Sequence, residues 1–191
     1  MKLLIDILQG IGLAAAAGMR PFLPTLVAGA FATADVGVDY DHTAFSFLES
    51  PVFLVAVAVV MVVSFVLRGR LETPAGTAAL QGISIGLGAL LFAATLDDRH
   101  AVWWPGLIGG VLVAGLAAAA VRDLFARVRG RLDREAATAL PIYAEGVATV
   151  LAALSILIPP VSVIAVGFLV WLLAGGRRRE GEKYAGLRIL R

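Results

Sequence analysis

Two charged residues lie inside apolar stretches of the chain and are the first candidates for chemistry. Arg20 interrupts the apolar run 3–34 and is followed directly by Pro21, with Pro24 three residues further on, and Glu145 stands in a later apolar run. A charge at membrane depth costs ~2.5 to 3.5 kcal/mol, so it is normally paired, near an interface, or facing a polar cavity. Proline removes a backbone hydrogen bond, so the N–H groups exposed beside Arg20 would suit an anion.

We expect Arg20 and Glu145 to meet, because they are the two charges that lie farthest from the loops. In a functional site, Arg20 would contact an anion and Glu145 would be its counter-ion or proton carrier. The alternative is a structural pair that locks two helices together. Tyr143 belongs to the same predicted site, and Gln9 and Gln81 would extend its polar lining, unless each only bonds a neighbouring backbone.

The amino-acid composition excludes most other kinds of catalytic or metal site. The chain has no cysteine, which excludes thiolate metal sites and cysteine nucleophiles, and its two histidines lie in polar loops. No histidine-based triad or zinc motif can therefore form within the membrane. Asp39, Asp41 and His42 form one polar cluster and residues 97–100 another, which we interpret as solvated loops, since consecutive residues rarely chelate one ion. We predict no metal, no cofactor and no enzymatic activity.

The elements that must position these residues are membrane helices. The chain has 191 residues, of which 60% are hydrophobic, and its apolar residues fall in long runs instead of a 3.6-residue stripe. Such a pattern is typical of a polytopic, all-α membrane bundle. We expect one transmembrane domain over 1–191, with the first helix broken at Arg20-Pro21, where this span either crosses fully or turns back. The six predicted spans are 3–34, 51–67, 77–96, 104–121, 136–158 and 161–175.

Loop charges predict the orientation. Basic residues gather after the second, fourth and sixth spans, whereas acidic residues gather after the first and third. The positive-inside rule then places both termini, including a basic tail over 177–191, in the cytoplasm. This distribution also explains the basic residues without nucleic acid.

Internal repetition suggests three helical hairpins in parallel orientation. The sequence Leu-Gln-Gly-Ile occurs at 8–11 and again at 80–83. Membrane sequences use few residue types, so chance matches are the alternative. Two glycine pairs spaced by four, Gly82 with Gly86 and Gly106 with Gly110, predict close packing of the third and fourth spans.

A basic amphipathic segment follows the fourth span. It would lie on a lipid surface and attract anionic headgroups, and its basic residues are Arg122, Arg127, Arg129 and Arg131. Membrane lipids are therefore expected partners. The predicted Arg20 site adds an anionic small molecule or lipid headgroup, and a homo-oligomer would add a second copy of the chain.

The first span resembles that of a family of small bacterial inner-membrane proteins that is catalogued as a domain of unknown function. The resemblance lies in the motif at Gly18, Arg20, Phe22, Leu23 and Pro24, and in a late acidic helix at Glu145 followed by Pro159, Pro160 and 177–179. The chain departs from the family's pattern at 122–135, and at Gly146, where a second acid is usual. The resemblance implies no activity, but it favours the Arg20 and Glu145 positions.

The sequence favours a transporter or lipid translocase for an anionic substrate. A non-catalytic scaffold or accessory subunit is the competing interpretation.

Overall fold

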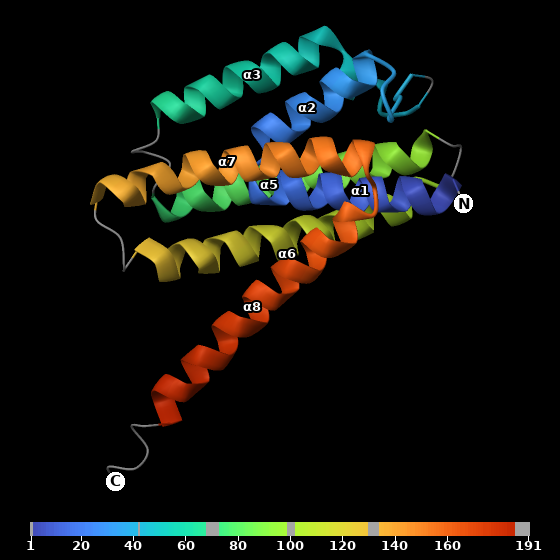
Figure 1. The fold of residues 1–191 in the computed structure, drawn as a ribbon. Coiled ribbons are helices and arrows are strands. Elements are labelled where there is room, and N and C mark those ends of the chain that lie inside the picture. The colour runs from blue at the N-terminus through green and yellow to red at the C-terminus, as the bar shows by residue number, and fades with distance from the viewer. Residues whose placement is uncertain (1, 42, 68–72, 99–101, 130–133, 186–191) are drawn as a thin grey trace.

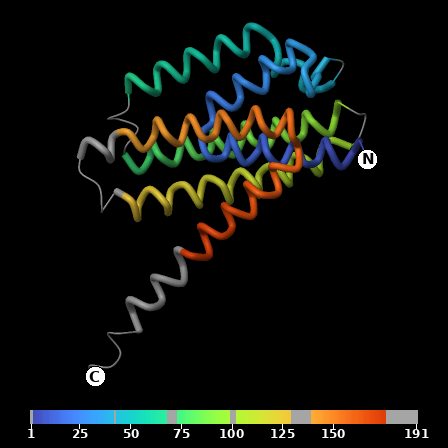
Figure 2. The backbone as a smooth tube through the Cα atoms, in the orientation of Figure 1, coloured from blue at the N-terminus to red at the C-terminus, as the bar shows by residue number. Residues whose placement is uncertain are grey.

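The computed structural model describes the backbone of residues 2–41, 43–67, 73–98, 102–129 and 134–185, and the side chains in these ranges except those of 129, 134–138 and 176–185. This part of the chain is all-helical, as the sequence predicts (Figures 1 and 2). Its α-helices are α1 (Lys2–Met19), α2 (Phe22–Thr33), α3 (Pro51–Val66), α5 (Pro74–Asp97), α6 (Trp104–Arg129), α7 (Arg134–Leu157) and α8 (Val161–Ala185), and a 3-10 helix η1 (Ser46–Glu49) precedes α3.

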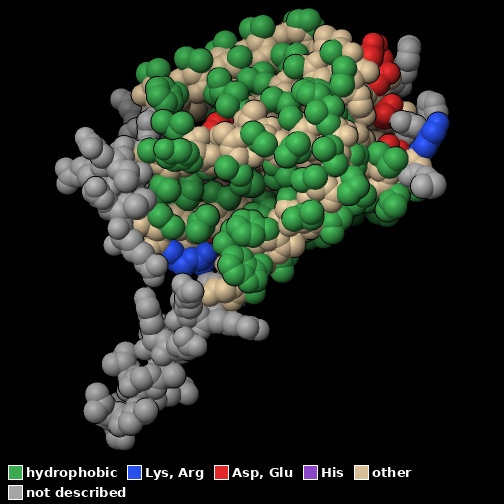
Figure 3. Space-filling model, viewed as in Figure 1, with side chains coloured by type: hydrophobic (Ala, Val, Ile, Leu, Met, Phe, Trp, Pro, Cys, Tyr) green, Lys and Arg blue, Asp and Glu red, His purple; other side chains and the backbone are tan. Residues whose placement is uncertain are grey.

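Four of the described helices are long and apolar enough to cross a membrane: α1, α5, and most of α6 and α7. Shorter apolar helices accompany them at Phe22–Thr33, Pro51–Val66 and Val161–Gly175. Figure 3 shows a surface dominated by apolar side chains, with acidic groups gathered at one end. These features indicate a membrane protein.

Local sequence sets where the helices begin. Ser50 caps α3 by accepting a hydrogen bond from the amide of Phe53 at 3.2 Å, and Thr73 caps α5 through the amide of Gly76 at 3.2 Å. A proline occupies the first position of each of these two helices, where no amide donor is required.

The predicted first span is two helices that double back on each other. The chain leaves α1 at Arg20, and α2 then returns along the bundle. Gln9 in α1 donates a hydrogen bond to the carbonyl of Gly37, just after α2, at 3.1 Å. The turn-back places Lys2 at the same end of the bundle as the loop 35–50, which we call the acidic end (Figure 1).

The two ends of the described chain therefore lie at opposite ends of the bundle, in contrast to the prediction that both termini share one side. The last helix, α8, leaves the acidic end and passes Arg127 of α6, whose guanidinium donates to the carbonyl of Leu172 at 3.3 Å. We call this opposite end, where α6 finishes, the basic end. The predicted orientation counted residues 3–34 as one crossing, although a turn-back at Arg20 was the alternative, and α1 and α2 do pass in both directions (Figure 1).

The core surrounds α1, whose residues 13–17 are fully buried. Small residues bring its neighbours close: Gly88 of α5 faces Ala14, and Gly18 faces the backbone of Ala114 in α6. Backbones that approach this closely gain van der Waals contact without needing large side chains. Alanine-rich sequence in α1 is thus explained by its central position.

Helices α5 and α6 pack against each other, but only one predicted glycine pair takes part. Gly106 and Gly110 lie against the backbone of Ala93 and Ala89 in α5, which confirms their role. Apart from their own stretch of helix, Gly82 and Gly86 have no atom within 4 Å of the position that a β-carbon would occupy, so their predicted role in this interface is wrong.

The predicted parallel hairpins are also not observed. Helices α1 and α5 run antiparallel, because Gly10 lies against Phe92 whereas Ala14 lies against Gly88. The repeated motif thus begins at the acidic end in α1 and at the basic end in α5. Gln9 and Gln81 are consequently at different levels of the bundle.

Candidate functional site

Arg20 and Glu145 meet where the first span is broken, as predicted. The Nε atom of Arg20 lies 3.9 Å from Oε2 of Glu145, and each side chain is 24% exposed. The pair joins the end of α1 to the middle of α7, two segments that are far apart in sequence. An ion pair that is only partly exposed is screened less by water than a surface pair.

The break is a junction between two helices. The amide of Arg20 donates to the carbonyl of Ala16 at 3.0 Å and completes the last turn of α1. Pro21 then stands at the N-cap of α2 without a side-chain cap. Pro24 falls in the first turn of α2, where a missing amide costs nothing. The hydroxyl of Thr25 donates to the carbonyl of Pro21 at 2.6 Å and secures the turn.

Glu145 supplies the cap that α2 lacks. Its Oε1 accepts a hydrogen bond from the amide of Leu23 at 3.3 Å. A carboxylate is favoured there because the amides at a helix N-terminus carry partial positive charge. The predicted anion position at the break is therefore occupied by a carboxylate of the protein itself.

Arg20 has an aromatic contact on the side of α6. Its guanidinium carbon lies 5.4 Å from the ring centroid of Phe125. Gly18, two residues before Arg20, faces Ala114, whereas Phe125 lies eleven residues further along α6 toward the basic end, so the guanidinium extends toward that end. A cation over an aromatic face is attracted by the ring quadrupole.

The family model described as "Domain of unknown function (DUF4126)" matches residues 7–179. The chain belongs to this family. The matched range includes both charged residues and the helix break. No curated protein and no solved structure matches the chain. Function in this member of the family therefore has to be argued from its own geometry.

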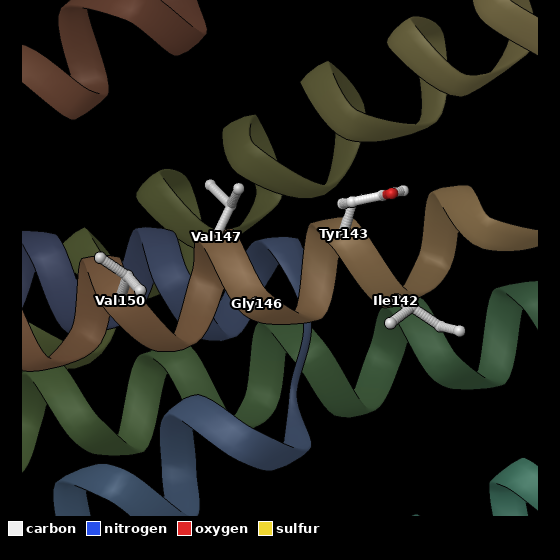
Figure 4. A pocket seen from close by; sticks show the side chains of 5 residues that line it. All are labelled: Ile142, Tyr143, Gly146, Val147 and Val150. Atoms are coloured by element: carbon white, nitrogen blue, oxygen red, sulfur yellow. The ribbon is translucent and has the colours of Figure 1, made fainter.

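Tyr143 lies apart from the pair. It is 71% exposed and lines a shallow apolar hollow of about 380 Å³ with Ile142, Gly146, Val147 and Val150. Figure 4 shows these side chains projecting from the outer surface of α7. Glu145 follows Tyr143 by two residues, which turns it roughly 200° around the helix. The hollow thus faces away from the ion pair, and the structure does not join Tyr143 to it.

Gln9 belongs to a polar cluster near the acidic end. Its side-chain nitrogen donates to the carbonyls of Gly37 at 3.1 Å and Ile156 at 3.0 Å, which is the backbone-bonding alternative considered from sequence. Asp6, one turn earlier, is only 2% exposed.

Two serines lie beside this cluster: Ser155, which the sequence predicts to bond its own helix, and Ser162, which sequence reasoning missed. The hydroxyls of Ser155 in α7 and Ser162 in α8 both face Gly12 of α1, where a β-carbon would collide with them. Ser155 donates to the carbonyl of Leu151 at 2.7 Å. The signal available in the sequence was a glycine in α1 together with serines on either side of Pro159-Pro160.

The predicted lipid-surface arginines are partly described. Arg122 has a 63% exposed side chain that lies 3.7 Å from Asp123, and Arg127 donates to the carbonyl of Leu172. The side chain of Arg129 and all of Arg131 lie outside the described residues, as do the side chains of the predicted tail 177–191. Arg122 is consistent with a surface role, whereas Arg127 joins α6 to α8.

Three carboxylates lie together at the acidic end. Asp39, Asp41 and Glu49 each place an oxygen within 4.8 Å of the others. Partial burial, followed by a hydrogen bond with Asp41, raises the pKa of the Glu49 carboxyl, while the amide of Tyr40 opposes the shift. Exposed acidic groups often cluster without an ion, so we assign no metal here. His42, the other member of the polar cluster predicted in this loop, lies outside the described residues.

Proposed function

We propose that this protein is a membrane transporter or lipid translocase for an anionic group. In this proposal Arg20 binds the anion, and Glu145 is its counter-ion and carries a proton. The observation that supports it is the carboxylate of Glu145 between the guanidinium of Arg20 and the amide of Leu23. An arrangement that holds one anionic oxygen pair provides the same donors to another anion.

The carboxylate of Glu145 and the substrate anion would compete for Arg20, and this competition allows one to replace the other. The 3.9 Å and 3.3 Å contacts of Glu145 are longer than the ~2.7 to 2.9 Å of tight charge-assisted hydrogen bonds. When Glu145 takes up a proton, it loses the charge that competes for Arg20. A substrate anion then neutralises Arg20, and loss of the proton from Glu145 releases the substrate.

The proposal includes an orientation in a bacterial plasma membrane. Arg122 and Arg127 lie at the basic end, which the positive-inside rule assigns to the cytoplasm. The acidic end then faces outward, and Lys2 with it. This replaces our expectation of two cytoplasmic termini with an outer N-terminus and a cytoplasmic C-terminus.

Purified protein in vesicles tests the proposal. We would measure the movement of inorganic phosphate and of fluorescent phosphatidylglycerol across the membrane, with and without a pH gradient. Arg20→Ala should reduce movement by at least about tenfold, the loss expected when a charged hydrogen bond of ~1.5 to 3 kcal/mol is removed. Glu145→Gln should remove the response to the pH gradient.

The matched control is Val150→Ala, on the outer face of α7, which should behave as the unaltered protein. If Arg20→Ala and Glu145→Gln both move the two probes as the unaltered protein does, the mechanism is rejected.

One observation favours the competing scaffold or accessory role. Glu145 bonds Leu23 and pairs with Arg20, so the break is held together by the protein's own groups. A purely structural pair predicts that both variants lower thermal stability according to the hydrogen bonds and charge pairing that each one removes. It also predicts that neither probe crosses the membrane with any of the proteins.

A further inference from the structure

The short helix α2 leaves part of its neighbours uncovered. It lies between α3 and α7 and contacts both, as Figure 1 shows. Among the residues that the structure describes, the backbone of α3 lies close only to α2 and η1, and not to that of α5, α6, α7 or α8. Wherever α2 is absent, the inner face of α3 is therefore not covered by another of these helices.

The point where α2 begins can be located on α3. Gly29 of α2 lies against Leu54 of α3, and the two helices run antiparallel. Equal rise along both helices then places Phe22, the first residue of α2, beside Met61. Ser64 lies about one turn beyond the start of α2, toward the basic end.

The exposure pattern agrees with this register. Val57, beside α2, is buried, whereas Val62, Val63, Phe65, Val66 and Leu67 are all exposed. Consecutive residues point in directions about 100° apart, so these five lie on the outer face and flanks of α3, and none of them shares the face of Val57 and Ser64. Ser64 on that face is partly exposed, whereas Val57 is buried. The side of α3 that faces the bundle is thus less covered beyond Met61. We call this surface the α2 step: residues 62–67 of α3, Glu145 of α7, and the first turn of α2 between them.

The α2 step combines apolar surface with the charged pair. Valine and phenylalanine form its α3 side, and the partly exposed Glu145, bonded to Leu23 and paired with Arg20, forms its other side. A water-soluble anion matches only the charged part. A phospholipid matches both, because it has a phosphate and apolar chains.

Charge at this end decides which phospholipid fits. The guanidinium of Arg20 extends toward the basic end beside Phe125, and Arg122 is exposed at the same end of α6. Basic residues at a membrane surface attract anionic lipids by ~1 kcal/mol each. We infer that the α2 step binds an anionic phospholipid of the leaflet at the basic end, with its phosphate at Arg20 and its chains along α3. This inference rests on the proposed function and specifies the substrate of that site.

The absence of cysteine permits a direct test, because one introduced thiol can be labelled alone. We would attach a bimane fluorophore to Ser64→Cys and measure quenching by brominated phosphatidylglycerol and by brominated phosphatidylcholine in vesicles. Ile164→Cys, exposed on α8, is the matched control. Val63→Cys replaces Ser64→Cys if the latter does not fold.

At residue 64 we expect about a fivefold preference for phosphatidylglycerol, which corresponds to one basic residue acting on the lipid. The preference should be lost in Arg20→Ala, restored in Arg20→Lys, and absent at residue 164. Equal quenching by the two lipids at residue 64, or a preference that persists in Arg20→Ala, would overturn the inference.

The vesicle measurements separate this inference from the proposed function. A preference for phosphatidylglycerol without movement of either probe supports lipid binding and rejects transport. Movement of inorganic phosphate that depends on Arg20, without lipid preference at residue 64, supports transport of a soluble anion and rejects the lipid.

Discussion

The carboxylate of Glu145 accepts a hydrogen bond from the backbone amide of Leu23, 122 residues earlier in the chain. A helix N-terminus is usually capped by a side chain from the residue just before it. Here Pro21 occupies that position and cannot cap, so a different helix provides the acceptor. The start of α2 therefore depends on the position of α7.

Replacing Glu145 should separate its two roles. Glu145→Leu removes both the acceptor for Leu23 and the partner of Arg20, and we expect it to lower the free energy of unfolding by ~1 to 3 kcal/mol. Glu145→Gln keeps an acceptor oxygen and should cost less. Thermal unfolding of the purified variants measures the order, and equal losses for Leu and Gln would contradict a capping role.

Gly18 should tolerate no side chain. A β-carbon there would lie 2.8 Å from the carbonyl carbon of Ala114, so Gly18→Leu forces α1 and α6 apart at a cost of ~1 to 3 kcal/mol or more. Gly146→Leu is the matched control, because Gly146 has open space around it. It should be neutral or slightly stabilising in the same thermal measurement. Equal effects of the two variants would contradict the packing.

Gln9 should hold the acidic loop against α7. Gln9→Ala removes hydrogen bonds to the carbonyls of Gly37 and Ile156, each worth ~0.5 to 1.5 kcal/mol. We expect faster hydrogen exchange around 35–41 without a change in α3. Gln81→Ala, at the other end of the bundle, is the control and should leave that loop as it is.

The acidic cluster should make loop stability depend on pH. Because folding raises the pKa of Glu49 above its ordinary value of 4.5, the protonated carboxyl is favoured in the folded loop. The resulting stabilisation is fully present below about pH 4.5 and is lost as the pH rises through the raised pKa. Exchange of the Leu48 amide, which lies next to Glu49 and donates to the carbonyl of Phe45 at 2.9 Å, should therefore slow as the pH falls, after correction for the intrinsic rate.

Glu49→Gln is the matched variant for this measurement. It retains an acceptor oxygen for Tyr40 without a titrating group, so the corrected exchange should lose most of its pH dependence. A pH dependence equal to that of the unaltered protein would exclude Glu49 as the source of the effect.

Single thiols should report the turn-back at Arg20. Leu3→Cys and Asp35→Cys lie at the same end of the bundle, on either side of the α1–α2 pair, whereas Arg122→Cys lies at the other end. In intact cells, an impermeant maleimide should label the first two and should reach Arg122→Cys only after permeabilisation. If Leu3→Cys, like Arg122→Cys, is labelled only after permeabilisation, then residues 3–34 cross the membrane only once.

Sequence alone predicted the pair because buried charges are costly. Arg20 and Glu145 stand in apolar runs, each needs a partner, and few other charges are available at depth. The direction of α2 could not be predicted in the same way. Pro21 ends a helix whether the chain continues across the membrane or turns back, and the choice depends on the contacts of α2 with α3 and α7.

The placement of polar side chains was harder to predict for a related reason. Gln9 and Gln81 stand in identical local sequences, which predicts similar positions, but α1 and α5 run in opposite directions. Tyr143 and Glu145 are close in sequence, and the helical turn directs them to different faces of α7. Local sequence determined the helices, and the direction of each helix determined which residues meet.

The bond between Gln9 and Ile156 also constrains how the protein is made, since 147 residues separate its two ends. At ~5 to 20 residues per second, the ribosome needs on the order of ten seconds to synthesise that interval. During that time Gln9 and the start of α2 have emerged while the later helices that satisfy them do not yet exist. Completion of the bundle therefore comes late in synthesis, and a nascent chain that stops before Pro159 lacks α8, one of the helices that pack against α1.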